Sequence, residues 1–280
     1  MKKLRNNPKP ILLTLLSNWI IAPLVTAGLA NLFLKGNEQL MVAVILLGAS
    51  PCTAMVLVWG KLAEGNQEQN VVNTSLNTIT IMVLYVPMVS LLTGIQGIPI
   101  DRGLLAISAF VFIGIPLVFG VVTKKLVIRA KGERWFENVY RPAVGTIAIG
   151  ALLMTLIVLF SLNGQVLLHN FKALLLVSVP LLLGFGIVVG YNLLVTKLSG
   201  LAYREAIITV IIGSSSHFEI AIATAIAIYG VGSYAALGTT MGLFWEVPVM
   251  LSLVALGKTL QRRAFWAKDT EKVALVPSSE

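Results

Sequence analysis

The chain has 280 residues, of which 57% are hydrophobic and only 12% charged, and its mean hydropathy is +0.88. This composition excludes an ordinary soluble domain. The net charge of +9 does not indicate nucleic-acid binding, because the basic residues gather between long apolar segments. We therefore expect a lipid bilayer as a partner, and no nucleic acid.

Eight apolar segments follow one another along the chain. Each is long enough to cross the roughly 30 Å hydrocarbon core of a bilayer as a helix, and the alternating pattern of a membrane β-barrel is absent. The sequence therefore predicts an all-α, polytopic membrane protein with eight transmembrane helices. The first segment continues past 20 residues, so we interpret it as a retained span and not as a cleaved signal peptide. The segments cover residues 10–34, 39–60, 70–96, 104–123, 143–168, 173–196, 206–229 and 232–256.

The basic residues predict the orientation of these segments. With the N-terminus inside, Lys35, Arg102 and Lys172 fall in outer loops, and the other 18 of the 21 Lys and Arg residues lie on the inner side. This bias follows the positive-inside rule. We expect a multi-pass protein of the cell (plasma) membrane with both termini cytoplasmic, and with the basic loop 124–141 facing anionic lipid.

The second segment contains a helix-breaking run, Gly48-Ala49-Ser50-Pro51-Cys52-Thr53. Ser50 is suited to an N-cap and Pro51 to the first helical position, which would place Cys52 in the first turn of a half-helix. The helix dipole would then favour a thiolate near the membrane midplane. Cys52 is the sole cysteine, so it forms no internal disulfide and no multi-thiolate metal site. The alternative is that Cys52 is a small packing residue.

The seventh segment contains a similar break, from Gly213 to Glu219. Ser216 and Glu219 have the spacing of a capping box, which predicts a second half-helix with Glu219 in its first turn. Of the twelve acidic residues, only Glu219 and Glu246 lie well inside the predicted spans. Carboxylates in such positions are usually functional. The alternative for Glu219 is that it merely completes the cap.

Three further side chains near the breaks are candidates for the site. Glu246 either carries protons or accepts a hydrogen bond from backbone that Pro248 frees. His217 either relays protons or is a structural histidine. Asn77 either lines the site or joins helices. Glu219, Glu246 and His217 are thus the candidates for proton coupling.

The two breaks belong to an internal repeat. They are 165 residues apart, and the Val86-Pro87 and Val247-Pro248 pairs in the segments that follow are 161 apart. The second and seventh segments are five spans apart, so they cross the membrane in opposite directions. Inverted repeats with broken helices indicate a transport site at the midplane, and we expect the two broken helices to cross.

Motifs of other chemistries are absent. The sequence has no phosphate-binding loop, no dinucleotide fingerprint and no Gly-x-Ser-x-Gly element. We therefore expect a transporter, with no enzymatic activity and no cofactor. Chain length predicts a single membrane transport domain, with residues 264–280 as a mobile cytoplasmic tail.

Three blocks of residues resemble those of a known family. Residues 50–59, Ser-Pro-Cys-Thr-Ala-Met-Val-Leu-Val-Trp, resemble the signature of the arsenical-resistance (arsenite efflux) permeases, and residues 218–223 and 246–254 resemble two further conserved blocks. These permeases belong to the bile/arsenite/riboflavin transporter superfamily. The resemblance covers residues 8 to about 262.

The resemblance implies two inverted five-span repeats and antiport of trivalent arsenic, as arsenite and often antimonite. It also implies essential roles for a cysteine and a glutamate that match Cys52 and Glu219. Together with the breaks, it predicts a substrate site of Cys52, Glu219, Asn77, Ser50 and Ser216, in which Cys52 binds As(III) as the substrate.

This sequence departs from the family pattern. It starts where the third span of the family starts, so residues 10–96 would form an incomplete first repeat and residues 104–256 the second. The family's Leu-Asn-Asp is Leu76-Asn77-Thr78, and its Asn before Phe-Glu is His217. The alternatives are a sodium-coupled organic-anion symporter of the same superfamily and an inactive truncated remnant. The sequence leaves a homo-oligomer open.

Overall fold

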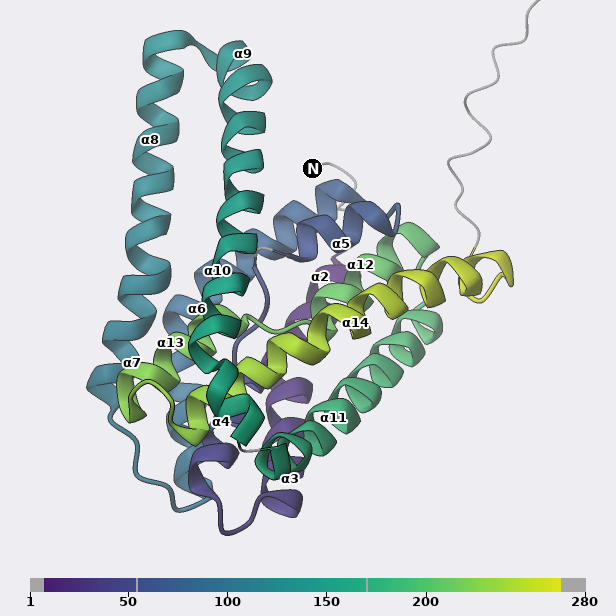
Figure 1. Cartoon of the computed structure of the whole chain (residues 1–280). Coiled ribbons are helices and arrows are strands. Elements are labelled where there is room, and N and C mark those ends of the chain that lie inside the picture. The colour runs from purple at the N-terminus through teal and green to yellow at the C-terminus, as the bar shows by residue number, and fades with distance from the viewer. Residues whose placement is uncertain (1–7, 54, 170, 268–280) are drawn as a thin grey trace, which may run out of the picture.

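The computed structural model describes residues 8–53, 55–169 and 171–267. In this part of the chain eight helical segments follow one another at the eight predicted positions (Figure 1). The first three are α2 with the π-helical turn η1 and α3 (Lys9–Leu16, Ser17–Ile21, Ala22–Phe33), α4 with α5 (Glu38–Gly48, Val56–Leu62), and α6 (Gln67–Ile95). The other five are α7 with η2 and α8 (Arg102–Ala109, Phe110–Gly114, Ile115–Lys131), α10 (Arg141–His169), α11 (Phe171–Leu198), α12 with α13 (Tyr203–Ser214, Phe218–Tyr229), and α14 (Tyr234–Arg262).

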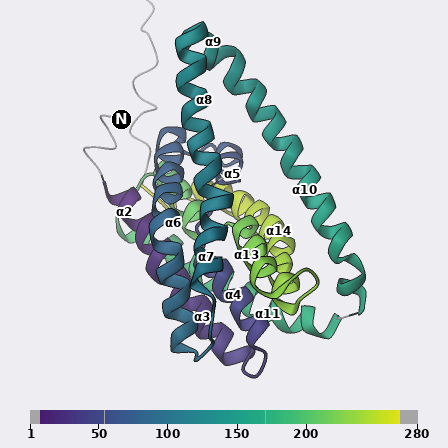
Figure 2. The ribbon, with the colours of Figure 1, turned by 90° about the vertical axis from the view of Figure 1, so that its left-hand side faces the viewer.

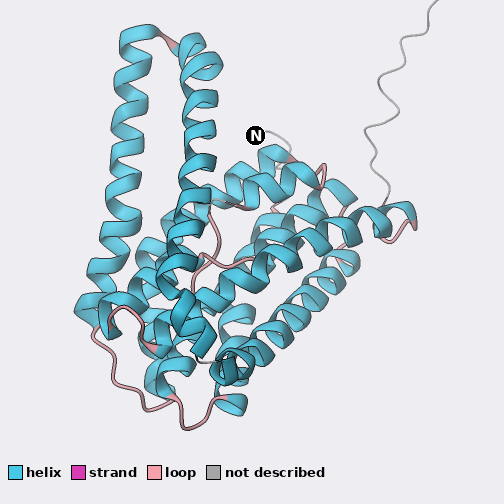
Figure 3. Cartoon of the chain, viewed as in Figure 1, coloured by secondary structure: helices cyan, strands magenta, loops and turns pink. Residues whose placement is uncertain are grey.

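The helices have the lengths and composition of membrane spans. Five are long and apolar enough to cross a bilayer, namely Lys9–Phe33, Gln67–Ile95, Arg102–Lys131, Lys172–Leu198 and Tyr234–Arg262. Two shorter apolar helices, α4 and α13, are halves of the interrupted segments. The predicted all-α, polytopic membrane fold is thereby confirmed, and Figure 3 shows helices joined by short loops.

Side-chain caps fix where several helices begin. Asn37 accepts a hydrogen bond from the Leu40 N–H at the start of α4, and Asn66 accepts one from the Gln69 N–H at the start of α6. Asp101 caps α7 in the same way. These caps satisfy N–H groups that have no partner inside the helix, so they end the preceding loops at defined residues.

The interrupted helices form the centre of the fold. In α4 the residues from Leu40 to Leu47 are all buried, and so are those of α12 from Ala206 to Ser214. Helices that are buried all round are surrounded by other helices. Here α14 packs against α4, α11 and α13, while α3 packs against α4 and α11. Figures 1 and 2 show this core from two sides.

Helices α8 and α10 meet at their ends near α9, beyond the core, and diverge from each other towards the core, as Figure 2 shows. The short α9 (Glu133–Trp135) and η3 (Phe136–Tyr140) join them. None of the α8 side chains is buried, and Phe119 of this helix is 69% exposed. An apolar surface of this kind on a membrane protein faces lipid or another helix.

The residues after α14 fold back onto the core as far as Ala267. Trp266 donates a hydrogen bond from Nε1 to Thr196 Oγ1 of α11 at 3.1 Å, and the Ala267 N–H donates to the Leu201 carbonyl at 3.3 Å. Residues 266 and 267, which the sequence assigned to the tail 264–280, thus contact the core, and the mobility of the tail stays a prediction. Residues 268–280 lie outside the described part of the chain.

Candidate functional site

The two interrupted helices break where predicted, and their breaks cross. α4 ends at Gly48 before α5 starts at Val56, and α12 ends at Ser214 before α13 starts at Phe218. Pro51 and Ser216 form an antiparallel β-bridge. Antiparallel pairing means that the two segments run in opposite directions, as an inverted repeat requires. We call residues 49–53 and 215–217 the crossing.

Backbone hydrogen bonds join the two segments of the crossing. The Cys52 N–H donates to the Ser215 carbonyl at 3.2 Å, and the His217 N–H donates to the Ser50 carbonyl at 2.6 Å. Each break frees backbone groups that the hydrocarbon of a bilayer cannot satisfy, and each segment supplies part of what the other lacks. The crossing is therefore held by main-chain bonds as well as by side chains.

The expected half-helix start at Cys52 is wrong. Ser50 Oγ donates back to the Leu46 carbonyl at 2.8 Å, so Ser50 closes α4 and does not cap α5. Cys52 lies in the extended segment, four residues before Val56, and is 2% exposed. Pairing with the other segment competes with helix formation here. The dipole of α5 consequently does not reach the thiol in the way that the sequence suggested.

Two asparagines support the cysteine segment. Asn77 on α6 donates from Nδ2 to the Cys52 carbonyl at 3.1 Å, and Asn18 donates from Nδ2 to Asn77 Oδ1 at 3.1 Å. Asn18 lies in η1, the π-helical turn of the first segment. Such turns often occur at functional sites. Sequence reasoning did not select Asn18, although a polar amide beside Trp19 in an apolar run was a signal.

The N-cap of α13, at the second break, differs from the predicted capping box. His217 is the N-cap of α13, and its Nδ1 accepts from the Ile220 N–H at 3.3 Å. The same Nδ1 lies 3.4 Å from Glu219 Oε2. The Glu219 side chain is 29% exposed in the first turn of α13. The expected capping box of Ser216 with Glu219 is therefore wrong, because His217 occupies the cap position.

Ser216 and its neighbour instead bind a buried carboxylate. Glu246 on α14 is 0% exposed. Its Oε1 accepts from Ser215 Oγ at 2.5 Å and from the Ser216 N–H at 3.2 Å, and its Oε2 accepts from Ser216 Oγ at 2.7 Å. A buried carboxylate needs such donors to offset its lost hydration. Glu246 thus holds the second break, whereas the sequence had suggested backbone freed by Pro248 as its structural partner.

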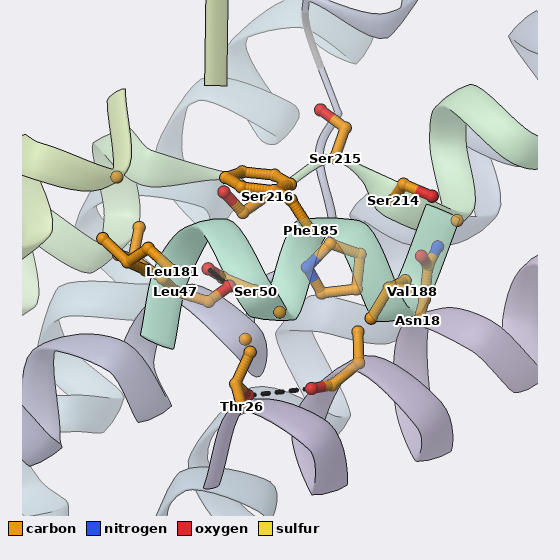
Figure 4. Close-up of a pocket in the computed structure, with 16 residues that line it drawn as sticks. Asn18, Thr26, Leu47, Ser50, Leu181, Phe185, Val188, Ser214, Ser215 and Ser216 are labelled. Carbon is orange, nitrogen blue, oxygen red and sulfur yellow. Dashed lines mark hydrogen bonds between the residues drawn. The ribbon is translucent and has the colours of Figure 1, made fainter. Parts of the chain in front are cut away.

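A cavity of about 50 Å³ lies beside the crossing (Figure 4). Ser50, Pro51 and Ser216 of the crossing line it, together with residues of α3 and α11. Cys52, Asn77 and Glu219, which the sequence places in the same site, are outside its wall as the structure describes it. Of the predicted substrate residues, Ser50 and Ser216 therefore line the cavity, whereas Cys52 in the crossing, Asn77 on α6 and Glu219 on α13 do not. The cavity is lined by Asn18, Ala22, Thr26, Leu47, Gly48, Ser50, Pro51, Leu181, Gly184, Phe185, Val188, Gly213, Ser214, Ser215, Ser216 and Gly242.

Glycine permits the close packing around this cavity. A Cβ on Gly48 would overlap the Thr26 side chain, and one on Gly242 would overlap Leu47. Helices approach each other closely at such positions. The crossing thus contains one soft thiol and several hydroxyl oxygens, and two carboxylates adjoin it, Glu246 through Ser215 and Ser216 and Glu219 through His217. Within the described residues, no three or more His, Cys, Asp and Glu side chains gather as a metal-binding group.

The chain is similar to a family of transporters and to several individual proteins. Residues 1–170 match the model of the Sodium Bile acid symporter family. The chain is 36% identical to the Arsenical-resistance protein Acr3 of Alkaliphilus metalliredigens, over 95% of this chain and 76% of the relative. It is 30% identical to the Acr3 protein of Corynebacterium glutamicum, over 86% and 68%. It is also 36% identical to the uncharacterized transporter slr0944 of Synechocystis, over 96% and 75%.

Proposed function

The chain belongs to the Sodium Bile acid symporter family, and we propose that this multi-pass membrane transporter exports trivalent arsenic. One structural observation carries the proposal. Two broken helices of opposite direction cross, and the sole thiol of the chain, Cys52, lies buried in that crossing. The similarity to two Arsenical-resistance proteins supports arsenite as the substrate.

The chemistry of the substrate suits a single thiol. At neutral pH, arsenous acid is an uncharged trihydroxide, so no net charge has to cross the bilayer. Cys52 would exchange its S–H for an As–S bond while one As–OH leaves as water, and arsenic stays trivalent. A single thiolate holds arsenic less tightly than three would, and the reverse exchange with water releases the substrate. Capture and release then use the same bond.

Glu219 is our candidate for the group that exchanges protons during transport. It is partly exposed at the start of α13, and His217 lies within 3.4 Å of it. A carboxylate in this place can take the thiol proton and pass it to the hydroxide that leaves arsenic, so that water forms. The proposal places the protein in the cell membrane with both termini cytoplasmic, and antimonite is a second substrate by the same chemistry.

A second candidate function follows from the description of the matching family model. A sodium-coupled organic-anion symporter would need several oxygen ligands for sodium, and Ser215, Ser216 and Glu246 supply oxygens at the second break. Sodium-dependent uptake of a radiolabelled bile acid by cells that express the chain would support this alternative. Arsenite efflux without such uptake would exclude it.

Expression in an arsenite-sensitive bacterial host tests the proposal. We expect the chain to raise the arsenite concentration that halves growth and to lower the arsenic content of the cells. Sensitivity to arsenate in a host without arsenate reductase should not change. A chain that reaches the membrane but alters neither growth nor arsenic content would contradict the proposed function.

A further inference from the structure

The hydroxyl groups around the cavity share one hydrogen-bonding pattern. Ser50 Oγ donates to the carbonyls of Leu46 and Leu47, at 2.8 and 3.1 Å. Thr26 Oγ1 donates to the Ala22 carbonyl at 2.8 Å, as Figure 4 shows. Each hydroxyl has one proton and two acceptor lone pairs. Because these protons are used within the helices, lone pairs are what the two groups can offer to the cavity.

The hydroxyls of the second break follow the same pattern. Ser215 and Ser216 both donate their protons to the carboxylate of Glu246. The Asn18 amide nitrogen, also at the cavity wall, donates to Asn77. Ser214 differs, because its Oγ accepts from Asn192 Nδ2 at 3.1 Å and so keeps its proton for another partner. Four of the five lining serine and threonine hydroxyls thus direct their protons to protein acceptors.

We infer that this cavity binds small, uncharged solutes that donate several hydrogen bonds, and that it rejects anions. The inference deepens the proposed function by giving the transporter a second subsite, separate from Cys52, for a neutral trihydroxide. Lone pairs of Ser50, Thr26 and Ser216 would accept the hydroxyl protons of such a solute, while an anion would meet acceptors that repel it. A cavity of about 50 Å³ holds a few waters, at about 10–15 Å³ for one, so the solute must be small.

Glu246 determines the direction in which the hydroxyl protons of Ser215 and Ser216 point. As a carboxylate it can only accept, so both serine protons turn towards it and away from the cavity. Glutamine at this position would donate to one serine and leave that serine's proton free to face the cavity. Other titratable groups in or next to the crossing are Glu219, the Cys52 thiol and the His217 imidazole.

Boric acid can probe binding at this subsite without a contribution from the thiol. It is a neutral trihydroxide at pH 7 and forms no bond with cysteine. We propose to measure amide hydrogen exchange of residues 213–218 in the purified full chain in lipid nanodiscs, over a series of boric acid concentrations. Boric acid and arsenous acid should slow exchange, and arsenate and sulfate should not. Replacing Cys52 by Ser should leave the boric acid midpoint unchanged.

Variants that remove a hydroxyl from the cavity wall can be compared with variants that remove a hydroxyl elsewhere. Ser50→Ala and Thr26→Val each remove one acceptor without leaving a buried donor unpaired, so they should raise the boric acid midpoint about three- to tenfold. Glu246→Gln should raise it as well. Ser75→Ala and Thr93→Val remove hydroxyls that donate to helix carbonyls away from this cavity, and they should leave the midpoint unchanged.

The two proposals fail in different ways. Equal protection by arsenate, protection by sodium ion but not by boric acid, or an unchanged midpoint in both cavity variants would overturn the inference. Arsenite efflux from cells would persist in that case if the proposed function holds. Conversely, boric acid protection without any arsenite efflux would leave the subsite standing and remove the proposed function.

Discussion

The backbone N–H of His217 donates to the carbonyl oxygen of Ser50 across 2.6 Å, and this bond joins the breaks of two helices that run in opposite directions. The same residue caps α13 through its imidazole. His217 therefore links two features of the fold. Its backbone pairs the two broken segments, and its side chain caps α13, the half-helix that carries Glu219.

Replacing His217 by Ala should loosen the first turn of α13. The substitution removes the acceptor of the Ile220 N–H, and loss of an N-cap costs about 1 kcal/mol. His217→Asn should cost little, because the Asn side-chain oxygen is also a good cap. Amide exchange of residues 218–222 should become about fivefold faster in the Ala variant and stay near the parental rate in the Asn variant. Equal exchange in all three proteins would show that the cap contributes nothing.

Replacing Glu219 by Gln should remove the pH dependence of arsenite efflux without disturbing the fold. The Gln variant keeps the shape of the side chain but cannot exchange a proton, and the cap of α13 is His217 and not Glu219. Glu219→Asp should retain part of the pH dependence. Efflux is measured in everted vesicles between pH 6 and 8, with the amount of folded protein as the control. A parental pH profile in the Gln variant would move the proton role to another group, with Glu246 next.

Replacing Gly48 by Ala should destabilise the core. The added Cβ would overlap Thr26 on the neighbouring helix, and overpacking of this kind costs about 1–3 kcal/mol. Gly28 of α3 is the matched control, because its added Cβ would meet nothing within 4 Å. Gly28→Ala should be neutral or stabilising by up to about 1 kcal/mol. Thermal unfolding in nanodiscs measures both, and an equal effect of the two substitutions would contradict the close packing of α3 and α4.

The fold was largely predictable because membrane spans depend on local composition. Length and hydropathy placed the eight segments, and helix-breaking residues placed both interruptions. The detail of the breaks was not predictable in the same way. Ser50 has the chemistry of an N-cap, but its hydroxyl turns back to α4, because the residues that follow pair with Ser215–His217 instead of starting a helix.

The candidate site shows the same division between local and distant effects. Scarcity of carboxylates in the spans singled out Glu246, yet no local pattern showed that its partners are Ser215 and Ser216, about 30 residues earlier in the chain. Asn18 was missed for a similar reason, since its role depends on Asn77 of another helix. Polar contacts between distant segments require the packing of the whole core.

The most direct test of the account compares arsenite accumulation in everted membrane vesicles that contain the parental chain or its Cys52→Ser variant. Serine keeps the size and the backbone pairing of residue 52 but cannot form the As–S bond. Both proteins should insert equally, as immunoblots of the vesicles would show. We predict energised accumulation of arsenite by the parental chain and none above background by the Ser variant. Equal accumulation by the two would contradict the assignment of Cys52 to the substrate.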